Sequence, residues 1–357
     1  MVLRVGVIGL GVGRSHVMGY RANLNSKITA LCDTNVVRLK EIADEFGIPE
    51  EACYTDYTAM LNEARLDMVS VCLPNALHAD VSIIALDSGA HVLCEKPMAT
   101  TISEAERMLE AAARNQRRLM VTYNWRYRAD SQWLYKVVQS GTLGEIYHVN
   151  VSWRRETGIP GWGLFGSKTM SGGGALIDLG VHVLDLGLWL LGFPEVKTVS
   201  GQARTVFGDK GRKTWARKPG QVIEGGFDVD DGAIGFLRLG NGANMLLQST
   251  WAEHTQPHED RIRVEVQGSE GTAVLSIGNY KKEDSLRLYT EIEGEPVTII
   301  PGIRWNTDTP HTALIGDLLD AITSDRPSPT DGQQGYVAVR VLEAMYASSA
   351  EGREIAF

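Results

Sequence analysis

The chain has 357 residues, more than one typical hydrophobic core accommodates, so we expect two domains. Its formal net charge is −9, which argues against nucleic acid or an anionic membrane as the main partner. The N-terminus enters a strand pattern at once and leaves no room for a signal peptide. The one long apolar stretch, 175–192, contains three ionisable residues and makes a poor membrane span. We therefore expect a cytoplasmic protein without a nucleic-acid or membrane partner.

The four cysteines all lie in the first third of the chain, and no two of them form a CxxC pair. This spacing favours reduced, buried thiols over a disulfide framework or a zinc site, so we expect no metal.

Residues 1–124 alternate between short, nearly continuous apolar runs and amphipathic helical runs. Strands are predicted at Leu3–Gly9, Ile28–Asp33, Asp67–Leu73, His91–Cys94 and Leu119–Thr122, with helices near 14–24, 36–46, 78–87 and 102–114. Such alternation is typical of an α/β domain with a doubly wound parallel sheet that is covered on both faces.

Longer strand patterns dominate residues 125–357, and all eight tryptophans also lie there. Hairpin signals join several of these runs, which predicts a second α/β domain with a large open, mostly antiparallel sheet. The runs are Ile146–Arg154, Val196–Val206, Ala233–Leu239, Asn244–Trp251, Arg261–Gly268, Thr272–Ile277 and Ser285–Ile292, with helices at 174–191, 310–323 and 331–350.

A glycine-rich turn follows the first predicted strand and contains Gly9, Gly11, Val12 and Gly13. Glycines at this place allow a dinucleotide pyrophosphate to approach backbone N–H groups at a helix N-terminus. Asp33 ends the second strand, where a carboxylate binds the adenosine ribose and repels a 2′-phosphate. We therefore expect NAD to be the cofactor, while the nearby cations Arg14 and Arg38 leave NADP open.

Two further strand ends place polar residues at the same edge of the predicted sheet. Pro74, Asn75 and His78 follow the third strand, and Glu95 and Lys96 follow the fourth. Ligands bind at this edge in doubly wound sheets. Lys96 would stabilise a substrate oxygen there, unless it is a surface lysine paired with Glu95.

The stretch Ser171–Gly192 is apolar at nearly every position yet contains Asp178, His182 and Asp185. Asp178 and His182 are four residues apart and share one helix face. Burying ionisable groups without partners is costly, so this helix either lines a polar pocket or holds a satisfied core pair. The glycines 172–174 would let another group approach its N-terminus closely.

These elements together resemble the glucose–fructose oxidoreductase, inositol dehydrogenase and rhizopine-catabolism superfamily (Gfo/Idh/MocA). The resemblance rests on VGVIGLGVGRSH, the EKP element at Glu95-Lys96-Pro97, the TYNWRY run at 122–127 and the helix at 171–192. It implies a Rossmann domain, 1–124, and a substrate-binding and oligomerisation domain, 125–357. It also implies NAD(P)-dependent chemistry on sugars and cyclitols.

The resemblance also assigns roles by position. Lys96, Asp178 and His182 are the implied catalytic residues, and Lys96 is an alternative base to His182. Contacts to the cofactor are implied for Gly9, Gly11, Asp33, Asn75, His78, Glu95, Asn124 and Arg126, of which Asn124 and Arg126 also border the substrate. One departure from the commonest family pattern is that His16 comes one residue early.

Weaker candidates complete the predicted substrate site. Trp153, Trp162 and Trp251 could stack on a sugar ring or belong to the core, and His311 starts a helix that could reach the substrate. Only one of the adjacent Arg154 and Arg155 can face a pocket. The basic segment 208–220 is predicted to be a solvated loop or lid.

We therefore expect an NAD(P)-dependent dehydrogenase that acts on a secondary carbinol of a sugar, sugar derivative or cyclitol, and that forms a homodimer or homotetramer. Two alternatives stay open at this level. One is an NAD-dependent glycosidase that uses transient oxidation, and the other is a ligand sensor without turnover.

Overall fold

The computed structural model describes residues 1–215, 226–256, 260–305 and 308–357, which fold into two compact units. The first unit comprises Met1–Tyr127 and Asn306–Val339, and the second comprises Arg128–Trp305 and Arg340–Phe357. The predicted domains are 1–124 and 125–357, whereas the first unit extends to Tyr127 and also includes residues 306–339.

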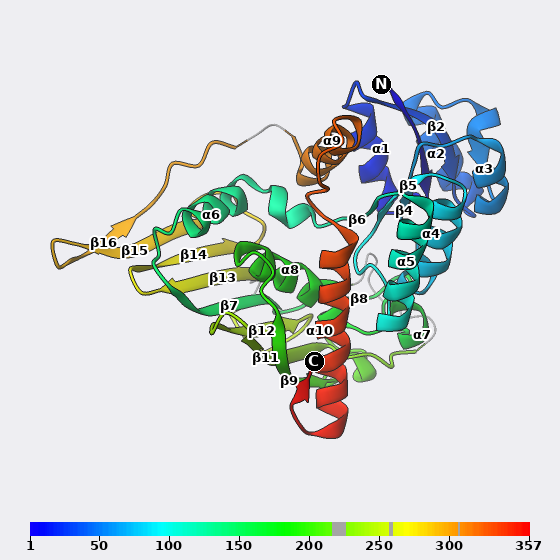
Figure 1. Ribbon diagram of the computed structural model, residues 1–357. Helices are drawn as coiled ribbons and strands as arrows, with labels where there is room; N and C mark the ends of the chain where they lie inside the picture. Colours follow the sequence, from blue (N-terminus) through cyan, green and yellow to red (C-terminus); the bar gives the residue numbers. More distant parts are fainter. Residues whose placement is uncertain (216–225, 257–259, 306–307) are drawn as a thin grey trace. The chain divides into compact units, whose positions relative to one another are not determined.

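The first unit contains a six-stranded sheet in the order β3-β2-β1-β4-β5-β6, with every neighbouring pair parallel (Figure 1). This is the strand order of a dinucleotide-binding Rossmann domain, so the predicted fold is confirmed. Its strands are β1 (Leu3–Ile8), β2 (Ser26–Cys32), β3 (Cys53–Tyr54), β4 (Met68–Val71), β5 (His91–Cys94) and β6 (Leu119–Val121). Every residue of β4 is buried, as expected for a central strand covered on both faces.

Helices connect these strands and begin at recognisable caps. Asn35 accepts from two backbone N–H groups of α2, and Thr101 forms a capping box with Glu104 at α5. The helices are α1 (Gly13–Arg21), α2 (Val36–Phe46), α3 (Tyr57–Glu63), α4 (His78–Asp87) and α5 (Ile102–Asn115). Helix α3 is too short for its periodicity to predict it.

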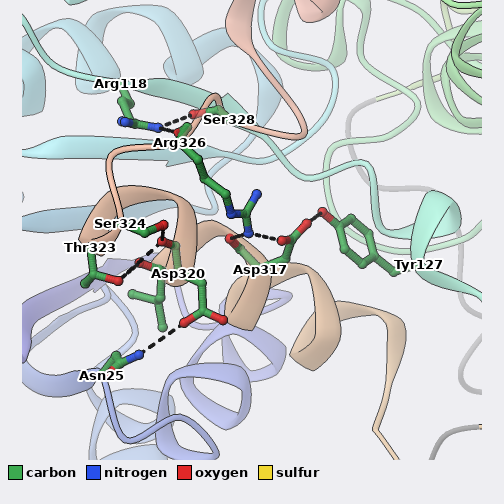
Figure 2. Close-up of polar contacts among 10 residues, drawn as sticks. Asn25, Arg118, Tyr127, Asp317, Asp320, Thr323, Ser324, Arg326 and Ser328 are labelled. Atoms are coloured by element: carbon green, nitrogen blue, oxygen red, sulfur yellow. Dashed lines mark hydrogen bonds and ion pairs between the residues drawn. The ribbon is translucent and has the colours of Figure 1, made fainter.

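Helix α9 (Pro310–Thr323) comes from far along the chain and packs on α1 in the first unit. Polar contacts fix its C-terminal half (Figure 2). The Tyr127 hydroxyl donates to Asp317 Oδ2 at 2.5 Å, and Asp317 also pairs with Arg326. Asn25 Nδ2 donates to Asp320 Oδ1 at 3.1 Å. These contacts tie α9 to other segments of the first unit, and His311 is the second residue of this helix.

The second unit contains a nine-stranded sheet in the order β16-β15-β14-β13-β7-β12-β11-β9-β17. Neighbours are antiparallel except for β7 and β12, so the expectation of a mostly antiparallel sheet is confirmed. The strands are β7 (Ile146–Arg155), β9 (Val196–Arg204), β11 (Gly232–Leu239), β12 (Asn244–Thr250), β13 (Asp260–Gly268), β14 (Gly271–Gly278), β15 (Leu286–Ile292), β16 (Glu295–Ile299) and β17 (Ile355–Ala356).

One face of this sheet is buried by helices α6 (Ala129–Gln139) and α8 (Val181–Leu190) (Figure 1). Burial alternates along the strands, as a sheet with one covered face requires. On β13, Ile262, Val264 and Val266 are buried, whereas the residues between them are partly exposed. The long helix α10 (Gly332–Glu351) contributes to both units.

Small elements complete the second unit. A two-stranded parallel pair joins β8 (Ile159–Pro160) to β10 (Thr214–Trp215), and α7 (Lys168–Ser171) precedes the central helix. Within the predicted loop 208–220, residues 208–210 form a 3₁₀ turn, and residues 216–220 lie outside the described part of the chain.

Among the described residues, one helical stretch, Lys168–Leu190, has the length and composition of a membrane-crossing helix. Its most apolar window of 18 residues is 83% buried within the protein, which is also typical of a soluble protein's core helix. This stretch is not regular, because Leu176–Gly180 forms a π-helical turn before α8 begins. Such turns are rare and frequently occur at functional sites.

Candidate active site

The glycine turn after β1 combines one packed glycine with one open glycine. Gly9 has φ +83°, and a Cβ there would lie 2.3 Å from the Cys72 carbonyl oxygen. Gly11 is exposed, and a Cβ on it would meet no atom within 4 Å. The backbone at Gly11 is therefore accessible to a ligand at the start of α1, which suits the predicted pyrophosphate contact. Val12 is also exposed at 44%, while Gly13 is buried against Val7.

Asp33 follows β2 and is held by backbone amides. Its Oδ2 accepts from Leu10 N at 2.7 Å, and its Oδ1 accepts from Asn35 N at 2.8 Å. Arg38 forms an ion pair with Oδ2 at 3.4 Å. The carboxylate is thus fixed beside the glycine turn, where the ribose of a dinucleotide would lie.

The predicted residues after β4 have different environments. Pro74 is exposed, and Asn75 begins a 3₁₀ turn (Asn75–Leu77) and is partly exposed. His78 is fully buried, with Nδ1 2.7 Å from the Pro97 carbonyl oxygen and Nε2 2.8 Å from the Leu73 carbonyl oxygen. Burial lowers the pKa of His78. This histidine therefore joins the loops that follow β4 and β5.

A buried polar chain runs from α1 to the end of β5. His16 is fully buried, with Nε2 2.9 Å from Glu95 Oε1 and Nδ1 2.9 Å from Ser70 Oγ. The Tyr20 hydroxyl lies 2.7 Å from Ser70 Oγ. Sequence reasoning noted His16 only as a departure from the family pattern. Its position on the inward face of the first turn of α1 is the signal that would have found it.

The last member of this row of buried polar residues, Glu95, is followed by Lys96. Lys96 is partly exposed and precedes Pro97 in a cis peptide bond. The Lys96 backbone N donates to Glu95 Oε2 at 3.2 Å. Burial alone would raise the pKa of Glu95, but the hydrogen bond from His16 and the charges of His16 and Lys96 lower it to about 2. Glu95 is therefore a carboxylate that anchors the backbone of Lys96.

Two residues from other segments join this first set. His311 has its ring centroid 6.0 Å from that of His16, and its Nδ1 lies 3.4 Å from Asn124 Nδ2. Burial lowers the pKa of His311. Arg126 is also predicted at the site, but it is only 1% exposed and donates to the Pro329 carbonyl oxygen and Gln334 Oε1 at 2.9 and 2.7 Å. In this structure Arg126 therefore binds the segment before α10 and the first turn of that helix.

The second set lies on the central helix of the other unit. From Gly173 to Leu188, every residue is buried except Asp178 and His182, which are both partly exposed. Asp185 is 1% exposed and does not belong to this polar face. Asp178 and His182 are therefore the two side chains of this stretch that solvent can reach.

Both side chains contact buried tryptophans. Trp251 is fully buried, and its Nε1 donates to Asp178 Oδ2 at 2.9 Å. Trp153 is 4% exposed, and its ring lies 5.6 Å from that of His182 at 42°. The Trp153 ring therefore packs beside the His182 ring, whereas Trp251 is a core side chain. Trp162 is partly exposed and meets Trp215 edge-on.

Asp260 accepts hydrogen bonds from Trp153 and from the neighbouring Arg155. It accepts from Trp153 Nε1 at 2.9 Å and from Arg155 Nε at 3.0 Å. Arg155 is the buried member of the arginine pair, and its partner Arg154 faces outward to Glu253. Although burial lowers the pKa of Arg155, its neighbours, Asp178 among them, raise it.

The glycine run before the helix accommodates protein groups. A Cβ on Gly173 would lie 2.1 Å from the Tyr346 hydroxyl, and one on Gly174 would lie 1.7 Å from the Asp230 carbonyl oxygen. The Asp230 carboxylate accepts from Gly174 N, Leu176 N and the Tyr346 hydroxyl at 2.7, 2.9 and 2.6 Å. The close approach predicted at this run is therefore made by a buried aspartate that caps the helix.

The chemistry of the two sets is that of proton transfer and oxygen binding. Among the described residues, no group of three or more His, Cys, Asp and Glu side chains could hold a metal ion. A Rossmann sheet with an accessible glycine turn, and with polar residues at the carboxyl ends of its strands, is the arrangement of a dinucleotide-binding domain.

Comparisons with known proteins identify the family. Residues 3–123 match the model for the oxidoreductase family with the NAD-binding Rossmann fold, and residues 131–274 match the GFO/IDH/MocA C-terminal domain. The chain belongs to the Gfo/Idh/MocA family, and it is an enzyme of the NAD-binding, sugar-dehydrogenase type.

Individual relatives are similar along much of their length. D-glucoside 3-dehydrogenase of Escherichia coli K12 is 30% identical over 99% of this chain and 97% of its own. Levoglucosan dehydrogenase of Pseudarthrobacter phenanthrenivorans is 28% identical over 80% of this chain and 76% of its own. The crystal structure of an oxidoreductase domain protein from Kribbella flavida superposes with a TM-score of 0.85, at 26% identity and 99% coverage of both chains.

Proposed function

We propose that this enzyme transfers a hydride between NAD and a secondary carbinol of a sugar, sugar derivative or cyclitol. The observation that supports this most is the central helix, which is buried at every position from Gly173 to Leu188 except at Asp178 and His182. An acid and a histidine exposed together from an apolar helix suit proton transfer to and from a substrate hydroxyl.

In this proposal His182 takes the hydroxyl proton as the carbinol is oxidised to a ketone. Asp178 orients the imidazole and stabilises the imidazolium that forms. Lys96, in the first unit, is the residue proposed to stabilise negative charge on a substrate oxygen by donating a hydrogen bond. NAD, when bound, accepts the hydride that leaves the carbinol carbon. Lys96 is the alternative base if His182 only orients the substrate.

The first unit offers groups suited to the cofactor. Asp33 would accept hydrogen bonds from the ribose, and the open backbone at Gly11 would meet the pyrophosphate. Asn75, Glu95, Asn124 and His311 complete the predicted set of residues near the nicotinamide and substrate. Asp33 favours NAD, and Arg38 is the cation that would tolerate NADP.

A substrate panel tests the proposal. The purified enzyme is given a methyl glucoside, levoglucosan or an inositol with NAD or with NADP, and the absorbance of the reduced cofactor is followed. We expect cofactor reduction with at least one sugar or cyclitol, and faster reduction of NAD than of NADP. Release of a free sugar from a glycoside without net cofactor reduction would contradict the proposal and favour a glycosidase. Binding without either reaction would favour a sensor.

A further inference from the structure

Trp251 lies at the end of β12 and has one polar atom, the indole N–H. The residue is fully buried, so this N–H needs an acceptor within the protein. The acceptor is Oδ2 of Asp178, at 2.9 Å. Trp251 is itself fixed, because its backbone N donates to the Asp231 carbonyl oxygen at 2.9 Å and its ring meets Phe227 edge-on.

The acceptor lies in the irregular part of the helix. Asp178 belongs to the π-helical turn Leu176–Gly180, which packs against β12. The approach is close, since a Cβ on Gly180 would lie 3.0 Å from Ser249 Oγ. A π turn changes the direction in which its side chains leave the helix. Outside the helix, the carboxylate of Asp178 contacts the buried Trp251 indole N–H.

We propose that Trp251 is a positioning residue for the reaction, because its indole N–H holds the Asp178 carboxylate in the orientation that serves His182. The inference rests on the proposed role of Asp178. It adds a residue to which the proposed function assigns no role, because Oδ2 of Asp178 accepts from the Trp251 indole N–H.

The relevant variant removes the N–H and keeps the ring. Trp251→Phe leaves an aromatic side chain in the core, and replacement of Trp251 by benzothienylalanine keeps the full ring shape with sulfur in place of N–H. For either change we expect kcat to fall by about 10- to 100-fold, the worth of one hydrogen bond to a charged group. KM and the affinity for NAD should change by less than about 3-fold, because the bond acts on the reacting group.

A double-mutant cycle separates positioning from a structural role. The loss of the N–H should cost rate in the wild-type background, but kcat should change by less than about 2-fold in the Asp178→Ala background, where no carboxylate remains to be oriented. Trp189→Phe is the matched control, since Trp189 stacks on Tyr135 at 4.2 Å in the same unit. We expect its kcat to stay near that of the wild type. Melting temperatures identify any variant that fails to fold. If Trp251→Phe does not fold, the benzothienylalanine variant is used to decide whether the N–H has a positioning role.

Each outcome has one meaning. Near-wild-type kcat after loss of the N–H, with a large loss in Asp178→Ala, would overturn the role of Trp251 and leave the proposed function standing. The role of Trp251 would also be overturned if the loss of its N–H lowered kcat as much in the Asp178→Ala background as in the wild type. Near-wild-type kcat in Asp178→Ala would instead overturn the proposed role of Asp178, and the role of Trp251 with it.

Discussion

Asp33 shows how a single carboxylate can determine cofactor choice. Two backbone amides hold it, and its ion-pair partner Arg38 is 46% exposed. A 2′-phosphate would therefore meet a fixed negative charge that a solvent-screened Arg38 neutralises only in part, whereas ribose hydroxyls would donate to it.

We expect Asp33→Ser to weaken NAD binding and to improve NADP relative to NAD by about 10-fold or more. The change removes a charge-assisted hydrogen bond worth about 1.5–3 kcal/mol, and it removes the repulsion of the phosphate. The measurement is kcat/KM with each cofactor for the wild type and the variant. A wild-type enzyme that already prefers NADP strongly would contradict this role for Asp33.

The sequence identifies candidate site residues better than it identifies the residues that contact them. Gly9, Asp33, Lys96, Asp178 and His182 can be found because each occurs at a strand end or at helical spacing that limits its position. The partner of Asp178 cannot, because Trp251 is 73 residues away and only folding brings its N–H to the carboxylate. For the same reason the glycines 172–174 suggest a close approach without naming Asp230.

Among the elements, strand β5 begins with a histidine whose titration makes the stability of the fold depend on pH. His91, its first residue, accepts the Arg118 backbone N–H at Nδ1 at 2.9 Å, which requires the neutral ring. Burial and the charges of Arg117 and Arg118 lower the pKa of His91 from 6.5 to about 4. Between pH 6.5 and 4 the unfolded chain binds a proton here that the folded chain does not, so stability falls as the pH falls through this window.

We expect His91→Asn to weaken this acid destabilisation, because an amide oxygen can accept the same N–H without titrating. Discounted for the partial exposure of the ring, the difference amounts to about 1 kcal/mol at pH 4.5. The measurement is urea unfolding of both proteins at pH 7 and 4.5. Glu95, with a pKa of about 2, titrates below this range and is common to both. An identical pH dependence for the two proteins would show that His91 does not contribute.

The central helix shows what periodicity predicts and what it misses. Its apolar character and the shared face of Asp178 and His182 follow from spacing. The π turn at Leu176–Gly180 does not, because apolar spacing does not distinguish a π turn from an α-helical one; the contacts of this region with Asp230 and Ser249 come from segments far along the chain.

For the whole molecule, local patterns predict the type of most elements but not all of their pairings. The parallel sheet of the first unit follows from alternating strands and helices. The parallel pairing of β7 with β12, and the return of residues 306–339 to the first unit, depend on contacts between segments far apart in sequence. Tyr127 bound to Asp317 is one such contact, and neither residue has a local signature for it.

The sheet of the second unit also leads to a prediction about assembly. Opposite the face covered by α6 and α8, β11 and β12 present Ile234, which is 45% exposed, and the partly exposed Phe236 and Leu246. An open sheet with apolar residues on its uncovered face favours self-association. We expect a dimer or tetramer by light scattering, and Ile234→Lys should shift it toward the monomer. A wild-type mass of 39.1 kDa alone at micromolar concentration would contradict this.

His182 is the residue proposed to move the substrate proton, and His182→Asn tests this role most directly. Asparagine keeps a polar side chain on the partly exposed face, so the melting temperature and the affinity for NAD should stay near those of the wild type. We predict that kcat falls by roughly 10²–10⁴, the usual worth of a positioned general base. A folded, NAD-binding His182→Asn enzyme with near-wild-type kcat would contradict the claim and make Lys96 the acid–base residue.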